Sequence, residues 1–301
     1  MCFWLGGDST DPEKWDVDAN WLRDSANQKP ASGDDLISPA GSPSISDGLA
    51  QGGLQLASFV VEEGYAGNIG KETENFVFKM EDDDFRFAGS GLARLEITVV
   101  TVGSISPVIA RAGRGSAGVP GLQLNCDLLN KVHVEGPGSV YLGVGLGGSS
   151  TKRDNLHVTG GARVVVGPDV TDIATTGRPN ATVTHRAADV TLECDAQNVE
   201  ALAGVYRQRE GYWVKANVHE STVYTSGSGT HTDTYVDCGG TVINSENNRD
   251  RTFTNVEIQR SGSWLDPAGT GTYTTAVEFP TGMDNCSLDF GRKKKLTVAN
   301  I

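Results

Sequence analysis

Hydrophobic and polar residues alternate along short segments of this chain, which predicts β-strands separated by turns. Between positions 36 and 110 the segments with this alternation are 54–61, 76–80, 85–87 and 95–102. An apolar side chain at every second position turns one face of a strand toward a core. Long leucine-rich stretches with helical spacing are missing from the sequence, so we expect an all-β protein.

A loose repeat begins near position 132. Each copy has β-branched residues, a short turn of small residues or glycines, and β-branched residues again. The copies close on Val140, Val164, Val190, Val223 and Val242, and the interval from Val190 to Val223 is the longest. A repeat of this length indicates a solenoid, whose units stack on one another. We therefore predict a parallel β-helix with these valines in its interior. The irregular intervals leave a β-sandwich with uneven hairpins as the alternative.

Composition divides the chain into four segments. We expect an N-terminal cap or anchoring segment at 1–35, a strand-rich entry region at 36–110, the parallel β-helix at 111–290 and a C-terminal tail at 291–301. Glycine accounts for 38 of the 301 residues, well above the roughly 7% of an average protein. This density suits a chain that turns often and packs its backbone closely.

Segment 199–215 departs from the repeat and falls within its longest interval. We interpret it as an insertion. Insertions in repeat proteins lie on one face, often the face that contacts a partner. Tyr206, Tyr212 and Trp213 are therefore candidate interaction residues.

Three of the five tryptophans, Trp4, Trp15 and Trp21, lie within segment 1–35. A solenoid needs a cap that covers its first unit and prevents end-to-end pairing. Aromatic rings suit this role because each buries about 150–250 Å². We expect these three residues to form that cap. The alternative is an interaction patch whose rings stack on sugars.

The formal net charge of −13 argues against a broad basic face for nucleic acid and against binding to an anionic membrane. The one basic cluster lies near the C-terminus, where Arg292 and Lys293 are candidates for contact with an acidic partner. The first residues do not form a secretory signal, and no apolar run is long enough to span a membrane.

The five cysteines are far apart, odd in number and without a CxxC pair: Cys2, Cys126, Cys194, Cys238 and Cys286. This spacing predicts neither a disulfide framework nor a zinc site, and it favours folding in a reducing compartment. We expect no metal and no cofactor.

Four of the five histidines lie beside a predicted strand, and His133, His157 and His219 each neighbour a valine. In a regular register they would stack into a column that could bind a metal or respond to pH. The alternative is that each is an isolated polar strand residue.

A polysaccharide-cleaving site would need two carboxylates on one flank of the solenoid. The candidates, none of them in a recognisable motif, are Glu135, Asp169, Asp172, Glu193, Glu220, Asp233 and Asp237. We therefore expect that the protein is not an enzyme.

The opening of the chain is similar to segments that begin many β-solenoid proteins of phages and bacterial surfaces. The residues that carry this similarity are Trp15, Asn20, Trp21, Pro30, Gly33, Asp34 and Asp35. The segments 48–49, 54–59 and 65–70 look like those of phage-encoded parallel β-helix virion proteins. The resemblance is confined to segment 1–75. It implies a β-helix that is often trimeric and displayed on a virion.

Two classes of function remain. The first is a structural virion component, made in the host cytoplasm, that decorates or stabilises a phage capsid. As a homotrimer it would contact the major capsid protein or another virion protein. The alternative is a tailspike or adhesin that binds or cleaves a host-surface polysaccharide.

Overall fold

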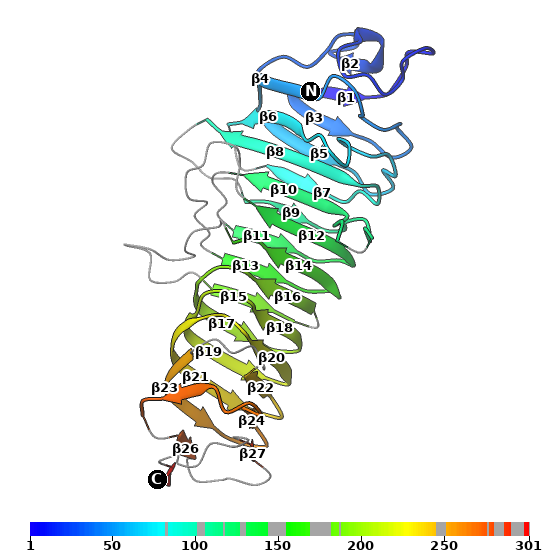
Figure 1. The fold of residues 1–301 in the computed structure, drawn as a ribbon. Coiled ribbons are helices and arrows are strands. Elements are labelled where there is room, and N and C mark those ends of the chain that lie inside the picture. The colour runs from blue at the N-terminus through cyan, green and yellow to red at the C-terminus, as the bar shows by residue number, and fades with distance from the viewer. Residues whose placement is uncertain are drawn as a thin grey trace. The chain divides into compact units, whose positions relative to one another are not determined.

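The structure is a computed structural model of the chain (Figure 1). It describes residues 1–81, 84–100, 106–116, 118–126, 131–143, 155–168, 182–186, 188–244, 251–275, 277–279, 286–289 and 298–300. The chain forms two units, residues 1–153 and 154–301. The described residues are almost entirely strands and turns, with a single short 3-10 helix, η1 (Asp18–Asn20).

In the first unit, odd-numbered and even-numbered strands from β3 onward belong to different sheets. One sheet has the order β2-β1-β3-β5-β7-β9-β11, and the other has the order β12-β10-β8-β6-β4. The strands are β1 (Cys2–Trp4), β2 (Trp21–Arg23), β3 (Asp35–Ser38), β4 (Ala50–Leu56), β5 (Ser58–Val61), β6 (Phe76–Met80), β7 (Phe85–Phe87), β8 (Ala93–Val99), β9 (Val108–Ile109), β10 (Leu122–Cys126), β11 (Lys131–Val134) and β12 (Gly138–Gly143).

The second unit has the same construction. One sheet runs β13-β15-β17-β19-β21-β23-β26-β28, with β25 also paired to β23, and the other runs β27-β24-β22-β20-β18-β16-β14. The strands are β13 (Asn155–Val158), β14 (Ala162–Val166), β15 (Thr182–His185), β16 (Ala188–Leu192), β17 (Ala196–Ala201), β18 (Gly204–Gln208), β19 (Trp213–His219), β20 (Ser221–Thr225), β21 (Gly229–Asp237), β22 (Thr241–Asn244), β23 (Arg251–Ile258), β24 (Ser263–Leu265), β25 (Gly271–Tyr273), β26 (Val277–Phe279), β27 (Ser287–Asp289) and β28 (Val298–Asn300).

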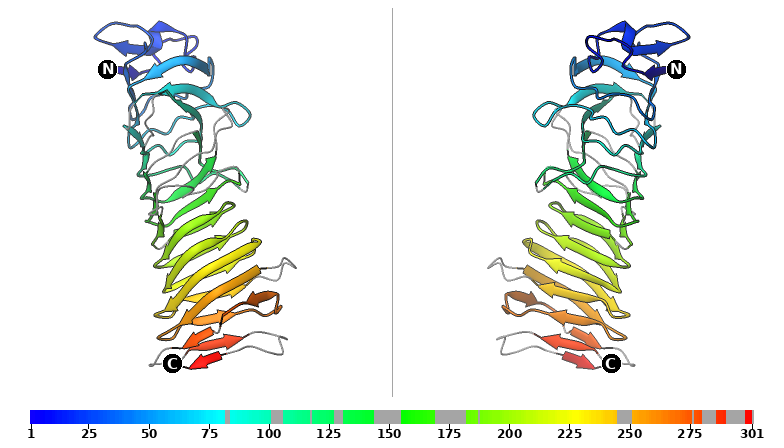
Figure 2. Two further views of the ribbon diagram at one scale, coloured as in Figure 1. Left: turned by 90° about the vertical axis from the view of Figure 1, so that its left-hand side faces the viewer. Right: turned by 90° about the vertical axis from the view of Figure 1, so that its right-hand side faces the viewer.

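The chain passes from one sheet to the other and back, and each circuit, here called a coil, adds one strand to each sheet (Figures 1 and 2). Within both units, neighbouring strands of successive coils pair in parallel, as β19 does with β21 and β20 with β22. Among the named strands described, β1 with β2 is the only antiparallel pair. The prediction of an all-β parallel β-helix is confirmed, because a sandwich of hairpins would have antiparallel neighbours.

The parallel ladder begins earlier than the sequence repeat. We expected the β-helix from position 111, after an entry region of separate strands. Instead β3 already pairs in parallel with β5, and β5 with β7. The predicted strands 76–80 and 85–87 coincide with β6 and β7. The predicted strand 54–61 is two strands, β4 and β5, which belong to different sheets.

An in-register column of side chains fills the interior of the second unit. Its members are Val164, Val190, Tyr206, Val223, Val242 and Trp264. All six are fully buried. Four of the five predicted valines therefore stack as expected. The fifth, Val140, is buried in the first unit, where it pairs with Leu122.

Tyr206 corrects the interpretation of segment 199–215 as an insertion. This segment includes the end of β17, all of β18 and the start of β19, and it forms regular coils. Val190 pairs with Tyr206, and Tyr206 pairs with Val223. The long interval between the two valines is therefore two short coils whose shared interior position is a tyrosine rather than a valine.

An aromatic cluster closes the N-terminal end of the first unit. Trp21 packs edge-to-face against both Trp4 and Trp15, with ring centroids 4.7 and 4.3 Å apart. Trp15 also packs on Phe76 of β6 at 4.5 Å. The indole N–H of Trp4 donates to the carbonyl oxygen of Pro43, 2.8 Å away. The predicted N-terminal aromatic cap is therefore present.

Glycines allow successive coils of the first unit to approach closely at one corner. A Cβ atom at Gly91 would overlap the carbonyl oxygen of Gly67. A Cβ atom at Gly113 would lie 2.8 Å from the carbonyl oxygen of Gly91. Glycine is therefore required at positions 67, 91 and 113, because any side chain there would clash with the backbone of the neighbouring coil.

Candidate functional site

The three N-terminal tryptophans proposed for interaction lie in the interior. Trp4 and Trp21 are 0% exposed and Trp15 is 2% exposed. The indole N–H of Trp21 donates to the carbonyl oxygen of Trp15 at 2.7 Å, so the polar atom of that ring is also used internally. These rings stabilise the end of the first unit and have no exposed face on which a sugar could stack.

The residues of the supposed insertion divide between interior and surface. Tyr206 and Trp213 are fully buried, whereas Tyr212, directly before β19, is 37% exposed. The Tyr206 hydroxyl donates to Oε1 of Gln208 at 2.7 Å, and burial raises its pKa well above the ordinary value. Tyr212 is therefore the member of this trio that a partner can reach. Arg292 and Lys293 lie outside the described residues.

The predicted histidine column does not extend from His157 to His219. Thr184, Glu200 and Asn217 follow His157 in register, and Asn217 lies two residues before His219. His157 pairs in register with Thr184, and His219 pairs with Asp237. His133 lies in the other unit, beside Val108. The coils between His157 and His219 differ in length, so these two residues do not fall at the same ladder position although each neighbours a valine.

His231 is instead an interior residue. Its ring lies against Trp213, 4.0 Å between centroids, and stacks on Phe253 at 5.0 Å. The backbone N–H of Trp213 donates to Nδ1 of His231, which leaves Nε2 to carry the proton toward the Thr225 hydroxyl. Burial, and then the charge of Arg251, lower the pKa of His231 to about 3. The ring is therefore neutral at physiological pH.

Arg251 anchors a second buried polar group in the same unit. Its Nε donates to the carbonyl oxygen of Gly227 at 2.8 Å, and its guanidinium also donates to Oδ1 of Asn244. Asn244 in turn donates to Asp266 at 2.9 Å, and the Tyr273 hydroxyl donates to the other carboxylate oxygen at 3.2 Å. Burial first, and then Asp266, raise the pKa of Tyr273. This chain of contacts joins three coils through their interior.

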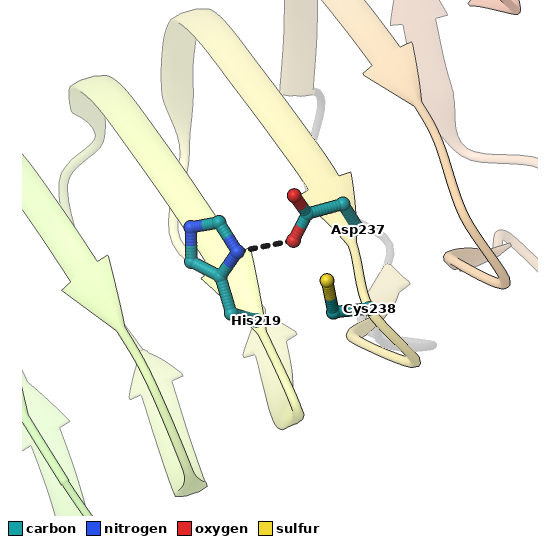
Figure 3. Close-up of side chains that lie close together, drawn as sticks. All are labelled: His219, Asp237 and Cys238. Atoms are coloured by element: carbon teal, nitrogen blue, oxygen red, sulfur yellow. Dashed lines mark ion pairs between the residues drawn. The ribbon is translucent and has the colours of Figure 1, made fainter.

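A cluster of potential metal ligands lies where two adjacent strands end (Figure 3). His219 is the last residue of β19, and Asp237, the last of β21, is its partner in the parallel ladder. Nδ1 of His219 contacts Oδ1 of Asp237. Cys238 follows in the turn, with φ of 47°, and its thiol faces the same space. One ligand atom from each of the three residues lies within 4.8 Å of the other two.

Sequence reasoning considered His219, Asp237 and Cys238 separately and predicted no metal site. The signal that could have joined them is the pair Val218-His219 and Val236-Asp237, since each valine is buried near the end of its strand. Aligning the two valines places His219 beside Asp237. A search for closely spaced cysteines could not find the cluster, because the sequence has no CxxC pair. His219 and Asp237 are far apart in the sequence and become neighbours only through strand pairing.

Three of the described candidates for carboxylate catalysis pair with a histidine, an amide or an arginine rather than with a second carboxylate. Asp237 pairs with His219, Asp233 accepts a hydrogen bond from Asn255 at 2.6 Å, and Glu193 pairs with Arg209 at 3.5 Å. Two further candidates, Asp169 and Asp172, lie outside the described residues.

One outward ladder of the second unit combines acidic, amide and aromatic side chains. Glu200, Asn217, Tyr235 and Glu257 follow one another in register on β17, β19, β21 and β23. The Asn217 amide donates to the Glu200 carboxylate, and the ammonium of Lys215 lies 5.4 Å from the centroid of the Tyr235 ring. Tyr235 is 37% exposed. We call these four residues the outer ladder.

The fold defines the chain as a parallel β-helix protein. In comparisons with family models, curated proteins and solved structures, nothing matches it at a significant level. Within the described part of the chain, no helix is long and apolar enough to cross a membrane. Arguments about function therefore depend on the residues themselves.

Proposed function

We propose that the protein is a structural virion component that decorates or stabilises a phage capsid as a homotrimer. Its partner would be the major capsid protein or another virion protein, and its place would be the assembled virion. The proposal combines the parallel β-helix with the resemblance of segment 1–75 to phage β-helix virion proteins.

The observation that carries the structural role is the in-register interior column of the second unit. Each coil contributes one fully buried side chain, from Val164 to Trp264. Ion pairs also join neighbouring coils on the outside of the solenoid. Asp189 contacts both Arg163 and Arg207, which belong to the coils on either side of it. Because its coils contact one another both in the interior and on the surface, the second unit should resist deformation. Such resistance suits a protein that bears mechanical load.

Exposed apolar side chains in each unit offer contact area for assembly. Leu5, Leu92 and Val100 are the examples in the first unit, at 37–44% exposure. Tyr212 and Tyr235 are the aromatic examples in the second unit. A symmetric trimer would cover such side chains on all three subunits at once.

The test combines the mass of the purified protein with its position on native particles. Light scattering should give three times the chain mass of 31.8 kDa. Electron microscopy should place copies over the shell. A monomer in solution, or copies confined to the tail tip, would contradict the proposal.

The outer ladder supports a second candidate, a tailspike or adhesin that contacts a polysaccharide. Its side chains repeat about every 4.8 Å, the spacing of paired strands. An aromatic face with flanking carboxylates and amides is suited to sugar rings and hydroxyl groups. Binding of host polysaccharide that is lost in Tyr235→Ala and retained in Tyr224→Ala would favour this candidate. Release of oligosaccharide would indicate cleavage.

A further inference from the structure

We propose that His219, Asp237 and Cys238 form a binding site for a zinc-type divalent ion. The site lies on the second unit and joins two successive coils. It is independent of the proposed role in a virion, because it requires only these three side chains and the register of β19 with β21.

The geometry is close to what a tetrahedral ion requires. Zinc lies about 2.0–2.3 Å from nitrogen, oxygen and sulfur ligands, which places neighbouring ligand atoms roughly 3.3–3.8 Å apart. The three ligand atoms here all lie within 4.8 Å of one another. His219 and Asp237 are in direct contact, so binding would move these two apart and bring the thiol closer. Side-chain rotations suffice, because His219 and Asp237 are partly exposed and Cys238 is exposed.

The backbone fixes the positions from which these side chains act. Parallel pairing holds His219 beside Asp237. Cys238 has φ of 47°, and the following Gly239 has φ of 78°, which turns the chain sharply after β21. The thiol is thereby directed back over the strand end (Figure 3). Two ligands come from one strand end and one from its neighbour, so an ion would cross-link consecutive coils.

Asp237 supplies the electrostatic attraction. Apart from its contact with His219, its Oδ1 atom is shielded from solvent and accepts no hydrogen bond from the described residues. That oxygen therefore keeps lone pairs for a cation.

The mixture of donors selects the class of ion. One imidazole nitrogen, one carboxylate oxygen and one thiolate sulfur suit a borderline-soft ion such as Zn²⁺ or Co²⁺. Mg²⁺ and Ca²⁺ prefer oxygen ligands alone. The exposure of Cys238 leaves the fourth position of a tetrahedron open to water.

The test uses Co²⁺ as a spectroscopic substitute for Zn²⁺ on the full-length protein. We expect one equivalent of Co²⁺ to give a thiolate charge-transfer band and tetrahedral visible bands, both removed by Zn²⁺ and unaffected by Ca²⁺. Cys238→Ser should lose the charge-transfer band. His219→Gln and Asp237→Asn should weaken binding by more than the roughly 10–100-fold typical of changes outside the ligand set.

Cys286→Ser is the matched control, because Cys286 is the other cysteine with solvent exposure. It should bind Co²⁺ like the original protein. A second readout is thermal: Zn²⁺ should raise the melting temperature of the original protein and leave that of Cys238→Ser unchanged. A Co²⁺ spectrum without a thiolate band, or a band that persists in Cys238→Ser and disappears in Cys286→Ser, would overturn the proposal.

Discussion

The backbone N–H of Trp213 donates to Nδ1 of His231, and the two rings lie 4.0 Å apart inside the second unit. This contact fixes the tautomer of His231 and favours its neutral state. A buried histidine that remains neutral makes stability depend on pH in a defined direction.

The first prediction is a loss of stability in mild acid. His231 has a folded-state pKa of about 3, below the usual value of 6.5. As pH falls below 6.5, the unfolded chain gains a proton that the folded chain does not accept, and the loss continues until the pH reaches about 3. Between pH 7 and 5 this residue should lower the free energy of unfolding by about 2 kcal/mol. Urea denaturation at both pH values measures the loss.

His231→Gln isolates that effect, because glutamine does not titrate. The variant should lose less stability than the original protein between pH 7 and 5. His157→Gln, at a partly exposed strand position, should behave like the original protein. Equal pH dependence in His231→Gln and the original protein would contradict the assignment.

A second prediction concerns the interior column. Val164→Asp places a charge where the original side chain is 0% exposed, so it should cost roughly 4 kcal/mol or more. The neighbouring Val165 points the opposite way and is partly exposed. Val165→Asp should therefore cost much less. Denaturant midpoints compare the two, and Val164→Ala serves if Val164→Asp does not fold.

The Arg251 contacts give a third prediction. Arg251→Met keeps the apolar stem but leaves the Gly227 carbonyl and the Asn244 amide oxygen without this donor. Each buried polar group left unpaired costs about 1–3 kcal/mol, so losing this donor should lower stability by several kcal/mol. Arg163→Met, at an exposed position, should change stability by less than about 1 kcal/mol. Similar denaturation midpoints for both variants would show that the buried contacts contribute little.

The N-terminal cap gives a fourth prediction. Trp21→Ala should destabilise the first unit by about 3–5 kcal/mol, because a fully buried indole is removed. Deleting segment 1–34 leaves β3 intact but exposes its edge and uncovers Phe76. That shortened protein should aggregate through strand pairing. If light scattering finds it monodisperse and calorimetry finds it equally stable, the first residues are not a cap.

The interior of the fold was readable in the sequence because a strand imposes a simple rule on its side chains. Alternation at Phe76, Phe78 and Met80 places all three inside, and the structure buries all three. The stacked valines of the second unit were found for the same reason. The interior position of Tyr206 was not predicted, because the repeat was defined by β-branched residues. The interior column accepts any side chain that fits the space, including a tyrosine.

The candidate site could not be read in the same way. His219 and Asp237 end strands of successive coils, and their contact depends on the length of one particular coil. Other coils differ, since the step from Val223 to Val242 is shorter than the step from Val242 to Trp264. Local residue patterns do not determine these lengths, so contacts between outward side chains of neighbouring coils emerge only in three dimensions.

The antiparallel strand β2 leaves β1 only one free edge, and the further strands of its sheet are added on that side only. It occupies the outer edge of β1 and leaves the opposite edge to receive β3. A ribosome delivers the N-terminal residues first, so β1, β2 and their tryptophans emerge before the coils that follow. This end can therefore act as a template during synthesis. We expect each new coil to form on the one before it, in the order of translation.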